Sequence, residues 1–176
     1  MGSEILIDGY NVIKRSASFQ SIGAKNLEYA REQLITQLLN RYRHTPHRVT
    51  VVFDGNDMHE QVQHKQRIRI IYSRHGETAD SVIARLAATA RAEGRVVEMY
   101  SDDREVQQAV SQRGGEIRTT EQLTDQLNAP SRDVGRRYKH RVAIRKKYGL
   151  DPMYYDDDEI ESPHSPGKKK NSHRKR

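Results

Sequence analysis

The sequence predicts an α/β fold with a central, mainly parallel sheet and helices on both of its faces. Short β-rich runs alternate with helical segments of roughly 10–18 residues, which is the pattern of βαβ units. Several β-rich runs end on an aspartate, at the edge where open α/β sheets place their sites. The excess of Lys and Arg is confined to the last 48 residues, which separates a folded body, residues 1–128, from a basic C-terminal extension, residues 129–176.

The first predicted strand and helix lie before Pro46. Residues 4–8 form a short apolar run that ends on an acid, as expected of a buried strand. Residues 26–43 carry apolar side chains at helical spacing, and Asn26 can cap the first turn. Pro46 prevents that helix from continuing.

Two further strands and the next helix occupy the middle of the body. Residues 48–54 and 68–72 are rich in β-branched residues, which favours strands. Residues 78–93 again show apolar side chains on one helical face, and Gly94 ends that helix.

The last predicted elements of the body are shorter. Residues 95–100 predict a strand and residues 104–113 a helix, followed by a glycine turn and a brief strand over residues 116–118. A final helix runs to about residue 127, with Thr119 or Thr120 as its cap.

The charge distribution favours a polyanionic partner. Residues 1–128 hold 17 Lys and Arg against 17 Asp and Glu, whereas residues 129–176 hold 14 against 7. Such an extension is typical of nucleic-acid binding, although it could also be a solubilising tail without a partner. Residues 131–148 predict a marginal basic helix and residues 165–176 disorder. The side chains predicted to contact RNA phosphates are Arg136, Arg137, Lys139, Arg141, Arg145, Lys146 and Lys147.

Several classes of protein are not expected. The chain has no cysteine, which excludes disulfides and thiolate metal sites and is consistent with a cytoplasmic location. No apolar run approaches the roughly 20 residues of a membrane span, and no signal peptide is recognisable. Neither G-x-G-x-x-G nor a P-loop motif occurs, so we expect no nucleotide cofactor.

The aspartates that follow the strands are the main candidates for chemistry. Asp8 and Asp54 each end a predicted strand, the pair Asp102 and Asp103 comes just after another, and Asp80 lies in the first turn of a helix. Carboxylates gathered at one edge repel each other unless a cation neutralises them. An all-oxygen set suits Mg²⁺ or Mn²⁺, which support phosphodiester hydrolysis.

Each acid also has a purely structural explanation. Asp8 and Asp54 precede glycines and could form turns, and Asp80 could interact with a helix dipole. Asp102 or Asp103 could be a helix N-cap. The convergence of all of them on one edge favours the metal site.

Four ordered motifs resemble the signatures of the YacP-like NYN domain, a branch of the PIN-like nucleases. They are ILIDGYNVI at residues 5–13, VVFDG at 51–55, ETADSVI at 77–83 and SDDREV at 101–106. The resemblance covers residues 3–128. It implies a PIN-like three-layer fold, a divalent metal ion and endonucleolytic cleavage of RNA. Members of the subfamily include ribosome-associated endoribonucleases that cut messenger RNA, so the implied partners are mRNA, rRNA and the ribosome.

The resemblance also implies roles for individual residues. Asp8, Asp80 and Asp103 would be the core metal-binding acids, with Asp54 as an accessory acid. Asn11 would orient the first acid or the scissile phosphate.

The last motif leaves one assignment open. Asp103 is preferred because Arg104 fixes the register, but Asp102 is the alternative ligand. Glu77 would support the metal or its water. The further supporting residues are Thr78, Ser101 and Arg104.

The leading hypothesis is therefore a metal-dependent endoribonuclease. The alternative is a non-catalytic protein that binds RNA or the ribosome and keeps the same fold. A metal-dependent phosphatase would need a D-x-D motif after the first strand, which Asp8-Gly9-Tyr10 lacks. Cleavage of DNA stays open, because metal chemistry alone does not select the sugar.

Overall fold

The computed structural model describes residues 2–129 and 142–144. The chain divides into two units, Met1–Ala129 and Pro130–Arg176. Within the second unit only residues 142–144 are described, and they are helical. Most of the predicted basic helix, and all of the segment predicted to be disordered, lie outside the described residues.

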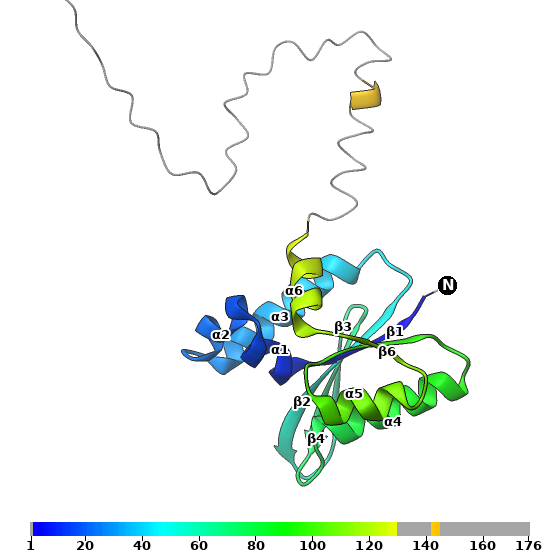
Figure 1. Cartoon of the computed structure of the whole chain (residues 1–176). Coiled ribbons are helices and arrows are strands. Elements are labelled where there is room, and N and C mark those ends of the chain that lie inside the picture. The colour runs from blue at the N-terminus through cyan, green and yellow to red at the C-terminus, as the bar shows by residue number, and fades with distance from the viewer. Residues whose placement is uncertain (1, 130–141, 145–176) are drawn as a thin grey trace, which may run out of the picture. The chain divides into compact units, whose positions relative to one another are not determined.

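The first unit is built on a mixed, mostly parallel sheet of six strands (Figure 1). The strand order is β3-β4-β2-β1-β5-β6, and only the β3–β4 pair is antiparallel. The strands are β1 (Glu4–Asp8), β2 (Arg48–Asp57), β3 (Gln61–Lys65), β4 (Ile68–Arg74), β5 (Val97–Tyr100) and β6 (Glu116–Arg118). The predicted fold class is thereby confirmed.

Helices cover both faces of this sheet (Figure 1). One face packs against α1 (Gly9–Arg15), α2 (Ala17–Gly23), α3 (Leu27–Tyr42) and α6 (Thr120–Asn128). The other face packs against α4 (Ala79–Ala92) and α5 (Arg104–Ser111). No helix in the described part of the chain is both long and apolar enough to cross a membrane.

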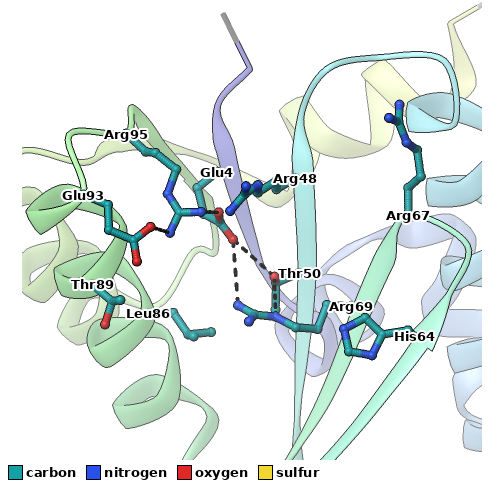
Figure 2. Close-up of a pocket in the computed structure, with 10 residues that line it drawn as sticks. All are labelled: Glu4, Arg48, Thr50, His64, Arg67, Arg69, Leu86, Thr89, Glu93 and Arg95. Atoms are coloured by element: carbon teal, nitrogen blue, oxygen red, sulfur yellow. Dashed lines mark hydrogen bonds and ion pairs between the residues drawn. The ribbon is translucent and has the colours of Figure 1, made fainter.

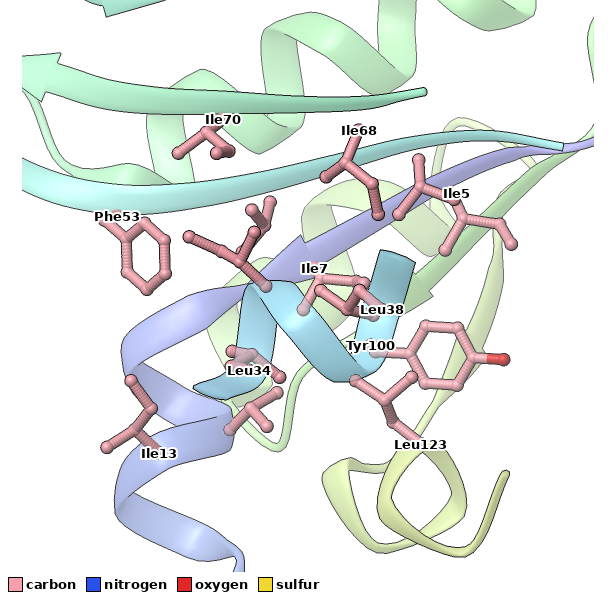
Figure 3. Close-up of a cluster of buried hydrophobic side chains, with 14 of the residues drawn as sticks. Ile5, Ile7, Ile13, Leu34, Leu38, Phe53, Ile68, Ile70, Tyr100 and Leu123 are labelled. Carbon is pink, nitrogen blue, oxygen red and sulfur yellow. The ribbon is translucent and has the colours of Figure 1, made fainter. Parts of the chain in front are cut away.

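Strand alternation divides the core into two clusters. In β1, Ile5 and Ile7 face the cluster of α1, α2, α3 and α6, whereas Leu6 faces the cluster of α4 and α5. Leu34 and Leu38 of α3 are fully buried in the first cluster (Figure 3). A central strand that buries both faces explains the uninterrupted apolar run of residues 5–7.

Three elements are not predicted by the sequence pattern. In the sequence, α1 reads as a continuation of the first strand, because Val12 and Ile13 are β-branched. In the structure, Asp8 caps a helix that begins directly after β1. The short α2 lacks a long periodic pattern. Strand β3 is polar because four of its five residues are exposed at the sheet edge. Strand β2 also runs three residues beyond its predicted end, to Asp57.

The chain reverses its direction of travel across the sheet at β1. Strand β1 pairs in parallel with β2 on one side and with β5 on the other. Such a switch point leaves a crevice at the carboxyl ends of the strands, where open α/β sheets bind their ligands. Asp8 is the last residue of β1, and Ser101 follows the last residue of β5.

Candidate active site

Four aspartates gather at the carboxyl edge of the central strands. Asp8 ends β1, Asp54 lies near the end of β2, Asp80 is the second residue of α4, and Asp103 is the N-cap of α5. Charge repulsion from Asp54 and Asp103 contributes to a raised pKa of Asp8, and Asp8, Asp54 and Asp103 all raise the pKa of Asp80. The acids expected to converge therefore lie close enough to influence one another.

Asp8 is the most buried of these acids, with 8% of its surface exposed. Burial is the largest cause of its raised pKa, and two hydrogen bonds act in the opposite direction. The backbone N–H of Asn11 donates to Oδ1 at 3.0 Å, and the Ser101 hydroxyl donates to Oδ2 at 3.4 Å. Both carboxylate oxygens are therefore oriented by the protein.

Asp80 is surrounded by several other acids, which add to the effect of its burial. Burial is the largest cause of its raised pKa. Repulsion from the other three aspartates and from Glu105 adds to the shift, so that the pKa reaches about 6. Glu105 lies in the first turn of α5 and is not among the residues that the sequence predicts for the site. Its only signal in the sequence is its position two residues after Asp103.

Three of the acids also hold the beginnings of helices. Asp8 caps α1, and Asp103 accepts a hydrogen bond from the backbone N–H of Glu105 at 2.9 Å. Asp54 accepts from the N–H of Ala79, the first residue of α4, at 2.8 Å. The positive ends of α1, α4 and α5 therefore face this edge and partly offset the repulsion between the carboxylates.

Hydrogen bonds from Ser101 and Asn11 tie the end of β1 to the loop after β5. Besides its bond to Asp8, the Ser101 hydroxyl accepts from the backbone N–H of Asp103 at 3.1 Å. The side-chain oxygen of Asn11 accepts from the N–H of Asp102 at 2.9 Å. These bonds fix the spacing between the first and last acids of the set.

Asp102 has a different environment from Asp103. Its two carboxylate oxygens accept hydrogen bonds from the backbone N–H and the hydroxyl of Thr120, at the start of α6. Thr120 itself is 2% exposed. Asp102 is not among the main causes of the raised pKa of Asp8 or Asp80, whereas Asp103 is among the causes of both.

The remaining predicted site residues lie at the N-terminal ends of α4 and α5. Glu77 forms ion pairs with Arg74 at 3.3 Å and Arg85 at 3.6 Å, and it is not among the main causes of the raised pKa of Asp8 or Asp80. Thr78 is the N-cap of α4 and accepts from the N–H of Ser81. Arg104, the first residue of α5, is exposed.

A group of aromatic side chains from α1, β2 and β4 is not predicted by the sequence reasoning. The rings of Tyr10 and Phe53 meet edge to face at 5.1 Å, and Phe53 stacks on Tyr72 at 5.6 Å. Arg31 lies over the Tyr72 ring and donates to the Tyr10 hydroxyl at 3.1 Å. A signal exists in the sequence, because Tyr10 and Phe53 each lie within two residues of a candidate acid.

The approach of Phe53 also explains the glycine after Asp8. A Cβ atom at Gly9 would lie 2.2 Å from Cε1 of Phe53, closer than packed atoms tolerate. The motif Asp8-Gly9-Tyr10 therefore requires a glycine, which has no side chain, at its centre.

The donor set fits a hard divalent cation in its chemistry. It consists of carboxylate oxygens, and positive charge among them would relieve the repulsion that raises the pKa of Asp80. Across residues 2–129 and 142–144, however, no three or more acids or histidines are already arranged to hold a metal ion. Coordination would therefore require the side chains to draw together.

The basic side chains predicted to contact RNA lie outside the described residues. They are Arg136, Arg137, Lys139, Arg141, Arg145, Lys146 and Lys147.

Comparisons with known proteins point to one family. The model of the YacP-like NYN domain matches residues 5–161, so the match extends beyond residue 128, where the resemblance found in the sequence stopped. The chain is 28% identical over 147 residues to the Bacillus subtilis (strain 168) protein named "Uncharacterized protein YacP", covering 82% of this chain and 86% of that protein.

Solved structures agree with this match. The crystal structure of a mutant of Rae1 (YacP) from Bacillus subtilis is similar with a TM-score of 0.63 and 27% sequence identity, covering 86% of this chain and 87% of that chain. A second crystal structure of Rae1 (YacP) gives a TM-score of 0.63 and 26% identity, with 84% of each chain covered.

Proposed function

The chain belongs to the YacP-like NYN domain family, a nuclease family with a PIN-like fold, and on that premise we propose that it is a divalent-metal-dependent endoribonuclease. The observation that carries the proposal is the group of four aspartates at the switch point of the sheet, where burial and then charge repulsion within the group raise the pKa of Asp8 and Asp80. Such repulsion costs free energy in the metal-free protein, and a bound cation would relieve it.

Asp8, Asp80 and Asp103 would hold the metal ion, with Asp54 as the accessory acid. Within the described residues, Asp54 and Asp103 each use only Oδ1 in a hydrogen bond, which leaves Oδ2 available. A bound Mg²⁺ or Mn²⁺ would activate water and stabilise the charge that develops on the phosphate during hydrolysis.

Asn11 and Ser101 would position the substrate and the first acid. The side-chain oxygen of Asn11 is occupied by the backbone N–H of Asp102. Its amide nitrogen, which has no partner in the described part of the chain, can therefore donate to an oxygen of the scissile phosphate. Ser101 holds Oδ2 of Asp8 in place.

The RNA substrate to test first is messenger RNA, both free and on translating ribosomes. Cleavage of a labelled mRNA is measured with Mg²⁺ or Mn²⁺ and with EDTA, for the native protein and for Asp8→Asn and Asp80→Asn. We expect metal-dependent cleavage that each substitution lowers on the order of 10²-fold or more, because a charge that supports the reacting phosphate is removed.

Asp125→Asn is the matched control, because Asp125 is an exposed acid of α6 that is not among the main causes of the raised pKa of Asp8 or Asp80. It should cleave like the native protein. A DNA strand of the same sequence tests selection of the sugar. If the native, Asp8→Asn and Asp80→Asn proteins behave alike on every RNA, the nuclease proposal is wrong.

The second candidate function is RNA or ribosome binding without cleavage. It is favoured by the fact that the described acids are not already arranged around a metal site. That function predicts RNA binding by the native protein that EDTA, Asp8→Asn and Asp80→Asn leave unchanged, with no cleavage in any condition.

A further inference from the structure

A pocket of about 390 Å³ lies at the opposite end of the strands from the aspartates. Figure 2 shows the side chains that line it. The pocket is formed at the amino ends of four parallel strands, where Glu4 begins β1, Arg48 begins β2, Arg69 lies near the start of β4, and Arg95 precedes β5. Residues Leu86, Thr89 and Glu93, on α4 and at its end, complete one wall. We call it the arginine pocket and propose that it is a second ligand site, which binds a phosphate ester.

A buried carboxylate organises the arginines of the pocket. Glu4 is 4% exposed, and its carboxylate lies 3.0 Å from Arg95 and 3.8 Å from Arg69 (Figure 2). Arg69 also donates to the hydroxyl of Thr50 at 3.2 Å, and Arg95 pairs with Glu93. These contacts fix two guanidinium groups, so they would lose little freedom on binding an anion.

Other basic side chains of the pocket are not neutralised. The side chain of Arg48 has no partner among the described residues, and Arg67 donates only to the backbone oxygen of Thr45, at 2.9 Å. Four arginines line the pocket with two glutamates, which gives a formal charge of +2 with His64 neutral. Residues 1–128 as a whole are balanced, so this surplus is local.

The chemistry of the lining selects phosphate. Guanidinium groups donate two parallel hydrogen bonds to phosphate oxygens, and a pocket of this volume lies within the usual range for small ligands. Oε2 of Glu4 is buried, pairs with Arg95 and accepts no hydrogen bond within the described residues, so this carboxylate holds Arg95 in place rather than contacting a ligand.

Two sources could supply such a ligand, a strand of RNA or a free nucleotide. Helix α4 has Asp80 at its beginning, and Glu93 follows its end, so about 20 Å separates the acids from the pocket along the helix axis. The pocket shares no residue with the acidic site. Binding there can therefore be measured separately from cleavage.

The test compares Arg48→Gln/Arg67→Gln with the native protein in EDTA. Binding of a labelled single-stranded RNA is followed by fluorescence anisotropy over a series of salt concentrations, and binding of AMP by calorimetry. Lys25→Gln/Arg113→Gln is the matched control, because it removes two exposed charges outside the pocket. Arg48→Gln alone is the second variant, since its side chain makes no contact that the fold requires within the described residues.

If RNA is the source, the pocket variant should bind RNA on the order of tenfold more weakly than the control. The slope of log Kd against log salt should fall by about 0.7 for each phosphate that the protein no longer neutralises. If a free nucleotide is the source, the variant should lose AMP binding and keep its RNA affinity. Equal binding of both ligands by the pocket and control variants would overturn the proposal. Because no divalent metal is present, none of these outcomes depends on the nuclease function.

Discussion

At the scale of single residues, charge and structural support are combined in the same side chains. Asp8, Asp54 and Asp103 each accept a hydrogen bond from a backbone N–H at or near the start of a helix. Replacement by Ala would remove both the charge and the cap, whereas Asn keeps a cap oxygen and removes only the charge. Asn variants are therefore the informative probes of chemistry at these three positions.

Asp102 and Asp103 should differ when each is replaced by Ala. Asp102→Ala leaves the buried N–H and hydroxyl of Thr120 without their acceptor, which should lower the free energy of unfolding by about 1–3 kcal/mol. RNA cleavage per folded molecule should change little. Asp103→Ala should abolish cleavage while costing only about 1 kcal/mol for the cap. Urea unfolding and cleavage rates measure both, and loss of cleavage by Asp102→Ala in folded protein would reverse the assignment.

Asp80 should make the metal-free protein less stable as the pH rises. Its pKa is about 6 when folded and near its ordinary value of 3.8 when unfolded, so the folded state holds more protons between these values. The free energy of unfolding should therefore fall across this window, and the decrease should be complete above pH 6. Asp80→Asn lacks this decrease.

Urea unfolding in EDTA at pH 4, 5, 6 and 7.5 checks this prediction. Asp80→Asn should gain stability relative to the native protein as the pH rises, and Mg²⁺ should reduce that gain. A stability difference between the two proteins that stays constant with pH would show that the pKa of Asp80 is not raised in the folded state. Asp125→Asn again serves as the control: its free energy of unfolding should differ from that of the native protein by an amount that does not change in this way between pH 4 and 6.

Not all of the site could be predicted from the sequence. Position after a strand identified Asp8 and Asp54, because the carboxyl ends of parallel strands meet at one edge. The same reasoning could not separate Asp102 from Asp103, since their difference depends on Thr120, which lies in a later helix of the chain. The pairing of Glu77 with Arg85 likewise depends on how α4 packs.

At the scale of elements, the predictable helices and strands are those with one clear apolar pattern. Helix α3 is expected from its spacing of apolar residues and its Asn26 cap, which accepts from the N–H of Tyr29 at 2.9 Å. Strand β3 shows no such pattern, because its pairing with β4 at the edge requires few buried side chains. Helix α1 depends on a cap that also ends the preceding strand.

Helix α3 offers a matched pair of leucines for testing its contribution. Leu34 is fully buried, whereas 44% of Leu27 is exposed at the start of the same helix. Leu34→Ala should lower the free energy of unfolding by about 2–5 kcal/mol, and Leu27→Ala by no more than about 0.5 kcal/mol. Urea unfolding followed by circular dichroism measures both, and equal decreases would mean that α3 does not anchor the core as described.

At the scale of the whole molecule, the extension is the part that the fold does not explain. The family match runs to residue 161, so it includes the basic segment of residues 136–147 but not the basic residues beyond 161. The family membership therefore extends into a region that the charge pattern separates from the body. The predicted boundary at residue 128 stays a prediction.

The two basic segments of the extension should contribute differently to RNA binding. Replacing all seven predicted RNA-binding residues by Gln should weaken binding and flatten its salt dependence, because fewer phosphates are neutralised. The matched control replaces the six Lys and Arg of residues 165–176, which lie beyond the family match, and should have a smaller effect. RNA affinity across a salt series checks this prediction, and an equal effect of both sets would mean that only total charge matters.

The central position of β1 determines when the acidic site can form during synthesis. Strand β1 is the first to leave the ribosome, yet its neighbour β5 ends at Tyr100, and Ser101 and Asp103 come later still. A nascent chain that lacks these residues carries Asp8 without the partners that orient it. The group of acids therefore stays incomplete until the chain has been translated through Asp103, although its first member, Asp8, is made near the beginning.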